Sequence, residues 1–212
     1  SDVFSSYLSL IILSEAPPAL YCSREVTFLL NSFSCQASGL RGGGVKAAII
    51  DAGFSCYAGL LGSELPASVT VKNFVDGENE WDVTETTNHG AAVAEVVYDI
   101  APQASLYLVK VNTPIDLEEA VDWLITQDVD IINTSVGWFN VSPGDGAGFF
   151  ADLAQQAREN GIFWVTAAGN SRTMHWGGPF NDMNGDNLHD YEVNDFFRFV
   201  NYFSPGPDEG YI

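Results

Sequence analysis

Three side chains that could do chemistry stand where the expected strands and helices begin or end. Asp51 ends the nearly apolar run of residues 45–50, His89 opens a helical stretch, and Asn170 follows the apolar run of residues 162–167. Each has an ordinary structural explanation when taken singly, because such residues commonly cap helices, pack in cores or make turns. A carboxylate, an imidazole and a carboxamide in this order and setting nevertheless form a candidate site.

The elements that must position these residues alternate between short apolar runs and amphipathic stretches. The expected strands are residues 45–50, 69–75, 106–111, 129–133 and 162–167. The expected helices are residues 89–98, 116–127 and 148–160. This alternation predicts right-handed crossovers and a parallel sheet covered by helices on both faces. Ligands of such sheets bind beyond the carboxyl ends of the strands, so the chemistry is expected there.

The helix expected over residues 116–127 has the clearest pattern. Its apolar residues recur at three- and four-residue steps and give one buried stripe. Asp116 is the expected N-cap, with Glu119 as its capping-box partner three residues later.

Four linked motifs between residues 45 and 170 resemble those of the subtilisin-like (S8) serine peptidases. They are IIDAG at 49–53, NHGAAVA at 88–94 followed by IAPQA at 100–104, INTSVG at 132–137, and VTAAGN at 165–170. The resemblance implies a three-layer α/β fold with a mainly parallel central sheet. Within this sequence that fold would be incomplete at its C-terminal side.

The resemblance also implies a role for each residue of the candidate site. Asp51 would accept a hydrogen bond from Nδ1 of His89 and so fix the tautomer of the ring. His89 would be the general base toward a serine hydroxyl and then the general acid toward the leaving amine. Asn170 would donate a hydrogen bond to the oxyanion of the tetrahedral intermediate.

The segment after the fourth expected strand resembles the substrate-binding strand of the family. Ser135, Val136 and Gly137 would pair with an extended polypeptide substrate, so that backbone hydrogen bonds supply affinity and pockets supply preference. Trp138 stands where many members of the family carry another glycine, and we expect it to shape the binding cleft differently.

The nucleophilic serine of the family has no counterpart among the 212 residues. In the family it lies in a Gly-Thr-Ser-x-Ala motif that opens a helix, and neither Ser171 nor Ser204 has that context. We therefore expect the serine to belong to a later segment or to a second chain. Without such a segment the sheet would expose apolar surface.

Two function classes remain open at this point. One is part of a serine endopeptidase that becomes active when the serine is supplied. The other is a non-catalytic subtilase-like module that binds peptides or assembles with a partner. A nucleotide-binding fold is disfavoured, because no Gly-x-Gly-x-x-Gly turn follows the first expected strand.

The chain is expected to have three parts. Residues 1–44 would form an N-terminal arm or linker, residues 45–175 the partial core, and residues 176–212 the start of an insertion or a C-terminal tail. The last part contains a set of oxygen donors that resembles a calcium loop, namely Asp182, Asn184, Asp186 and Asp190. Because the nearby glycine is not at the EF-hand position, a solvated turn is the alternative to structural calcium. The chemistry itself would need no cofactor.

Composition narrows the partners and the location. Acidic residues outnumber Lys and Arg by 28 to 8, and the formal net charge of −20 repels nucleic acid and anionic membranes, so we expect neither as a partner. The subtilisin-like resemblance implies a secreted, extracellular protein. The three cysteines are either small buried hydrophobes, or Cys22 and Cys35 form a disulfide in an oxidising compartment, with Cys56 left over.

Overall fold

The computed structural model describes residues 32–84, 87–138, 141 and 146–169. The chain divides into two compact units, of which one comprises residues 1–137 with 153–170 and the other residues 138–152 with 171–212. The first unit contains the whole described sheet and is considered first.

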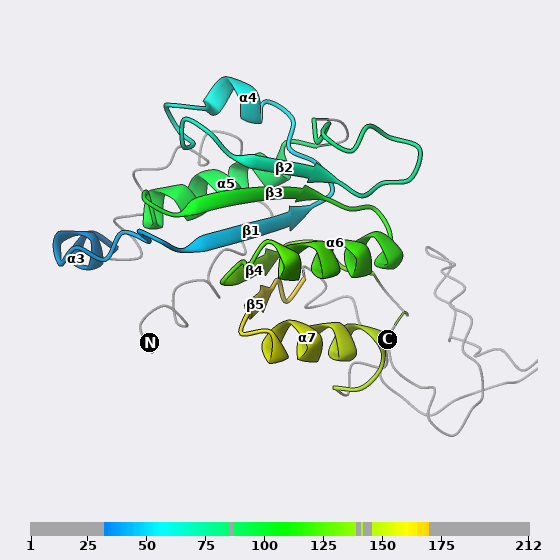
Figure 1. Cartoon of the computed structure of the whole chain (residues 1–212). Helices are drawn as coiled ribbons and strands as arrows, with labels where there is room; N and C mark the ends of the chain where they lie inside the picture. The colour runs from blue at the N-terminus through cyan, green and yellow to red at the C-terminus, as the bar shows by residue number, and fades with distance from the viewer. Residues whose placement is uncertain (1–31, 85–86, 139–140, 142–145, 170–212) are drawn as a thin grey trace, which may run out of the picture. The chain divides into compact units, whose positions relative to one another are not determined.

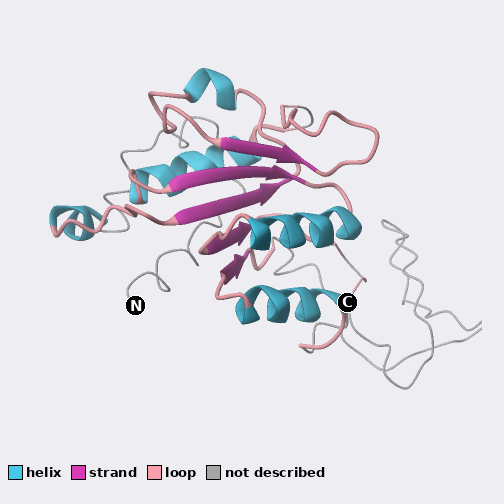
Figure 2. Ribbon diagram, in the orientation of Figure 1, coloured by secondary structure: helices cyan, strands magenta, loops and turns pink. Residues whose placement is uncertain are grey.

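Five parallel strands form one sheet in the order β2-β3-β1-β4-β5 (Figure 1 and Figure 2). The strands are β1 Lys46–Asp51, β2 Thr70–Asn73, β3 Ser105–Lys110, β4 Ile131–Thr134 and β5 Phe163–Thr166. Every neighbouring pair is parallel, which confirms the expected α/β fold with a parallel sheet. All the carboxyl ends therefore lie at one edge of the sheet.

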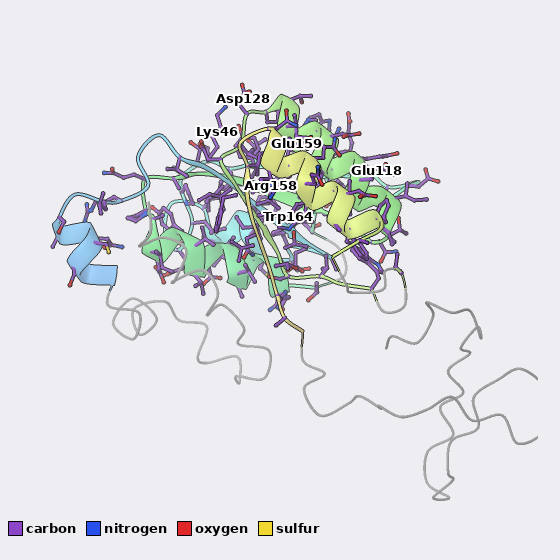
Figure 3. All side chains as sticks on the ribbon, turned by 90° about the horizontal axis from the view of Figure 1, so that it is seen from below. Lys46, Glu118, Asp128, Arg158, Glu159 and Trp164 are labelled. Atoms are coloured by element: carbon purple, nitrogen blue, oxygen red, sulfur yellow. The ribbon has the colours of Figure 1, made fainter. Side chains whose placement is uncertain are left out.

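Helices cover both faces of this sheet, as the alternating pattern predicts. The helices are α3 Ser32–Ala37, α4 Tyr57–Leu60, α5 His89–Ile100, α6 Pro114–Thr126 and α7 Phe149–Glu159. Figure 3 shows α6 and the second half of α7 on one side of the sheet and α5 on the other. A hydrogen bond of 2.7 Å from Gln156 of α7 to Asp122 of α6 joins the two neighbouring helices. The short helices α3 and α4 were not predicted from the sequence.

Strand parity decides which side chains can reach α5. Alternate residues of a strand face opposite sides of a sheet. An apolar cluster fills the space between the strands and α5, and its members include Ala47, Ile49, Leu106, Leu108, Val93, Ala94 and Val97. Asp51 has the same parity as Ala47 and Ile49, so its side chain points to the side where His89 begins α5.

The start of α6 differs from the sequence-based expectation. The N-cap is Thr113 rather than Asp116, and the helix begins with Pro114, whose missing amide hydrogen costs nothing at that position. Thr113 accepts from the backbone of Asp116, while the Asp116 carboxylate accepts from the backbone of Thr113 at 2.9 Å. The expected box of Asp116 and Glu119 was therefore wrong by three residues, because Asp116 is itself the capping-box partner.

Two expectations about other parts of the chain can be compared with the described residues. Cys56 is exposed, at a φ of 71°, which contradicts its interpretation as a buried hydrophobe, because the turn directs it away from the core. In the expected arm, Gln36 donates to the carbonyls of Asp99 and Ile100 at 2.6 and 3.1 Å. This part of the arm therefore contacts the last turn of α5, whose carbonyls lack partners within the helix. The expected domain boundaries stay predictions.

No helix within the described ranges reaches the length and apolarity that crossing a membrane requires.

Three carboxylates gather where α5 faces the turn before β2. Burial raises the pKa of Glu95 to about 7, and the charges of Glu64 and Asp99 add to this effect. Burial and the charge of Glu64 raise the pKa of Asp99 to about 6. Each raised pKa means that the folded state binds the proton more tightly than the unfolded state does. The stability that this protonation contributes is present below about pH 4.5 and is lost as the pH rises to about 7.

We expect Glu95→Gln to reduce the pH dependence of folding. The melting temperature of the wild type should fall between pH 4.5 and pH 7, and that of the variant should fall less. At pH 8 the variant should be the more stable protein, because its residue 95 cannot ionise. The matched control is Glu118→Gln on the exposed face of α6, labelled in Figure 3, which makes the same change of charge. Thermal melts that give Glu95→Gln and Glu118→Gln the same pH dependence would contradict the role of this cluster.

Candidate active site

Asp51 and His89 meet at the carboxyl edge of the sheet. Nδ1 of His89 lies 2.7 Å from Oδ2 of Asp51, and the second carboxylate oxygen accepts a hydrogen bond of 2.8 Å from the backbone N–H of Ala52. The side chain of Asp51 is 2% exposed, whereas that of His89 is 40% exposed. A buried carboxylate thus holds one nitrogen of a ring that remains accessible from solvent.

The electrostatics of the pair suit proton transfer. The hydrogen bond to Asp51 raises the pKa of His89 above its ordinary value of 6.5, burial opposes this, and the negative charge of Asp51 adds to the increase. When His89 is neutral, its Nδ1–H donates to the carboxylate. The lone pair of Nε2 is then the one that can accept a proton.

Gly90 allows α5 to start against the end of β1. Its backbone N–H donates to the carbonyl of Gly53 at 3.1 Å. A Cβ at Gly90 would lie 2.6 Å from that carbonyl oxygen, 2.7 Å from Cβ of Asp51 and 2.7 Å from the ring of Phe54. A glycine after the histidine is therefore what permits the close approach of the two backbones.

The expected substrate-binding residues lie beside this pair. Ser135 follows β4 directly, and its backbone N–H donates to the carbonyl of Ile50 at 3.3 Å, which extends the pairing of β4 with β1 by one residue. Ser135 and Val136 are half-buried and Gly137 is exposed. Their position at the carboxyl edge suits an extended ligand, and their binding role stays a prediction.

The remaining predicted site residues cannot be compared with the structure. Asn170 lies one position beyond the described residues, although Ala167 still pairs with β4 through a 3.0 Å hydrogen bond to Thr134. The expected calcium ligands from Asp182 to Asp190 fall in the undescribed residues 170–212. Within the ranges that the structure describes, no three acidic, histidine or cysteine side chains are grouped so as to hold a metal.

Two residues near the pair were not predicted from the sequence. The hydroxyl of Thr87 accepts a hydrogen bond of 3.1 Å from the backbone N–H of His89 and fixes the start of α5. Lys110 ends β3 in register with Asp51 and is 1% exposed. The sequence offered one signal for Lys110, namely a lysine at the end of an otherwise apolar strand.

In the second unit, Trp138 stacks on Phe150, with ring centroids 5.9 Å apart and planes inclined by 13°. Phe149 packs edge-on against Phe150 at 5.3 Å. These contacts hold the indole of Trp138 in place within that unit. Its expected effect on a binding cleft stays a prediction.

Comparison with known proteins agrees with the fold and the motifs. Residues 42–194 match the model of the subtilase family, Peptidase S8, and the chain belongs to this family. Membership supports serine peptidase chemistry.

The chain is similar to several bacterial proteases over part of their lengths. It is 31% identical to subtilisin DY of Bacillus licheniformis over 68% of this chain and 53% of that protein. It is 29% identical to the minor extracellular protease Epr of Bacillus subtilis over 63% of this chain and 21% of that protein. It thus spans about half the length of the first relative and less of the second. A crystal structure of a lanthipeptide protease shares the fold, with a TM-score of 0.53 and 21% identity over 65% of this chain and 43% of that one.

Proposed function

We propose that this chain is the part of a subtilisin-like serine endopeptidase that carries the aspartate and histidine of the triad. The observation that carries the proposal is the 2.7 Å contact between Nδ1 of His89 and the buried carboxylate of Asp51. Such a contact orients an imidazole and stabilises its protonated form without transferring a second proton. It serves no evident purpose in a domain that only binds.

The reaction follows from the orientation of the ring. Nε2 of His89 takes the proton of a serine hydroxyl as its oxygen attacks the peptide carbonyl, and Asp51 stabilises the imidazolium that forms. The imidazolium then protonates the leaving amine. The side chain of Asn170 donates to the oxyanion, and Ser135, Val136 and Gly137 pair with the extended substrate.

The serine itself belongs to a segment outside this sequence, either a later part of a longer chain or a second chain. The absence of a Gly-Thr-Ser motif and the partial coverage of the bacterial relatives support this assignment. So does an apolar pocket in the first unit, between the end of α5 and the strands β1 and β4. Its lining includes Ala47, Val97, Ala101, Ala104 and Ile131. A further apolar segment packed there would remove this surface from water.

We further propose that the protein acts outside the cell and cleaves polypeptides. One relative is named an extracellular protease, and the net charge of −20 suits a protein that does not bind nucleic acid or anionic membranes.

A fluorophosphonate probe, which reacts with activated serines, tests the proposal. The chain is incubated with the probe alone and together with the segment that follows it in its parent gene. Labelling of the serine only in the mixture is expected, and labelling should be lost when the mixture contains His89→Ala. No labelling in either sample would overturn the catalytic proposal.

The second candidate function is a non-catalytic subtilase-like module that binds peptides or assembles with a partner. The missing serine motif is the observation that favours it. Failure of the probe together with measurable binding of an extended peptide would support this alternative.

A further inference from the structure

A buried lysine lies directly beside the aspartate of the candidate site. Lys110 and Asp51 are paired residues at the ends of β3 and β1, and paired residues of parallel strands face the same side of a sheet. The side chains of Lys110 and Asp51 are each 2% exposed. Burying an ammonium group is unfavourable unless a partner compensates its charge. The residue that pairs with Lys110 is therefore the one that this lysine holds in place.

That partner is Glu78, in the loop that connects β2 to α5. Nζ of Lys110 donates a hydrogen bond of 2.5 Å to Oε2 of Glu78. The same oxygen accepts a hydrogen bond of 2.8 Å from Nδ2 of Asn73. The hydrogen bond to Lys110 is the largest cause that lowers the pKa of Glu78, and the bond to Asn73 is the second. Figure 1 shows this loop beyond the arrowheads of β2 and β3.

Asn73 extends the anchoring to the rest of the loop. Its Nδ2 also donates to the carbonyl of Asp82 at 2.8 Å, and its Oδ1 accepts from the backbone N–H of Val75 at 2.9 Å. Its own backbone N–H donates to the carbonyl of Glu80 at 2.7 Å. One buried asparagine therefore gathers the loop around the carboxylate that Lys110 holds.

The far end of the same loop is attached to the residues that follow Asp51. The backbone N–H of Phe54 donates to the carbonyl of Val83, and that of Ser55 donates to the carbonyl of Thr87, both at 2.8 Å. His89 comes two residues after Thr87. The loop thus joins Lys110 at one end to the backbone of the Asp51 segment and to His89 at the other.

We propose that Lys110 and Glu78 are positioning residues, whose ion pair fixes the loop that sets the distance between His89 and Asp51. This inference rests on the proposed function for the identity of the catalytic pair. Lys110 donates to Glu78, and its task is to hold the loop. Neither Lys110 nor Glu78 takes part in proton transfer.

A direct effect of charge can be separated from positioning by its sign. The charged group that contacts the histidine is Asp51, and the charged group beside the ion pair is Asp82. Removing the positive charge of Lys110 alone would raise the pKa of His89, because the neighbouring carboxylates would be less compensated. Loosening the contact with Asp51 would lower that pKa. The double variant Lys110→Met/Glu78→Gln leaves the net charge unchanged and isolates the second effect.

The experiment is an NMR titration of the three histidines in this chain, with His89 assigned from the His89→Ala variant. We expect Lys110→Met/Glu78→Gln to lower the pKa of His89 toward its ordinary value. We also expect the low-field signal of the proton between Nδ1 and the carboxylate to weaken.

The matched control is Lys72→Met/Glu80→Gln. It removes an ion pair of the same composition that joins β2 to this loop. This pair is the more exposed of the two, with side chains 15% and 57% exposed against 2% and 32% for Lys110 and Glu78. The control should leave the pKa of His89 unchanged. An unchanged pKa in the Lys110 double variant, or an equal fall in both double variants, would overturn the positioning role.

The variant Asp51→Asn separates a failure of the positioning role from a failure of the proposed function. If Asp51→Asn leaves the pKa of His89 unchanged, the catalytic pair itself is refuted. If Asp51→Asn lowers the pKa and the Lys110 double variant does not, only the positioning role fails.

A milder variant keeps the inference testable if the double variant does not fold. Glu78→Gln preserves the shape of the side chain and one acceptor oxygen. Hydrogen exchange at the amides of Phe54 and Ser55, which bridge to the loop, should become about tenfold faster or more. Exchange at the wild-type rate in this variant would overturn the proposal.

Discussion

Replacing His89 with alanine in the completed protein should lower kcat for peptide hydrolysis by about 10⁶-fold, the magnitude known for the general base of a subtilisin triad. The loss is expected on kcat because the imidazole would act on the proton that moves in the transition state, whereas binding of the substrate is assigned to other residues, 135–137. KM should change little. Steady-state rates with a chromogenic peptide, measured for wild type and variant, give both constants.

The matched control for this prediction is His175→Ala, which removes a second histidine at a position to which no catalytic role is assigned. It should retain wild-type kcat. If kcat of His89→Ala lies within tenfold of the wild-type value, His89 is not the general base. This conclusion would not depend on the result for the control.

The second large effect is expected from Gly90→Ala. Alanine is the better helix former by about 1 kcal/mol, so propensity alone predicts a more stable protein. The added methyl group would instead meet the Gly53 carbonyl, Cβ of Asp51 and the buried ring of Phe54, all within 2.7 Å. Neither a backbone carbonyl nor a fully buried ring can move aside freely. We expect a net loss of about 1–3 kcal/mol in the free energy of unfolding and a displaced His89.

Urea denaturation and the NMR signals of His89 measure the two consequences separately. Gly59→Ala in α4 is the matched control, because a Cβ there would meet no atom within 4 Å. That variant should be neutral or slightly more stable. A Gly90→Ala protein as stable as Gly59→Ala, with the His89–Asp51 hydrogen bond intact, would show that α5 does not depend on this close approach.

The contact between Asp51 and His89 could be predicted because its signals are local. Asp51 ends a buried run, His89-Gly90 begins a helix, and parallel strands bring their carboxyl ends to one edge. The same reasoning predicts that Asn170, after the fifth strand, lies at this edge. Asn170 is outside the described residues, so its position and its role stay predictions. The partner of Lys110 could not be found in this way, since Glu78 lies in a loop whose path no periodicity describes.

The N-terminus of α6 shows a related limit on a smaller scale. Apolar spacing located the helix, but Thr113, Asp116 and Glu119 offer overlapping capping patterns within two turns. Pro114 suits the first turn of a helix, and the hydrogen bonds of Asp116 select the earlier start.

The sequence alone determined the class of fold, the order of its strands and longer helices, and the residue types that meet at the edge of the sheet. This was possible because burial imposes a period on each strand and helix, and because parallel topology places their ends together. Only the tertiary structure decided how the β2–α5 loop is held and how closely His89 approaches Asp51. Those contacts depend on a buried charge finding its partner across 32 residues of chain. The attraction between the two charges must outweigh the cost of removing the lysine from water, and no local pattern in the sequence reports that balance.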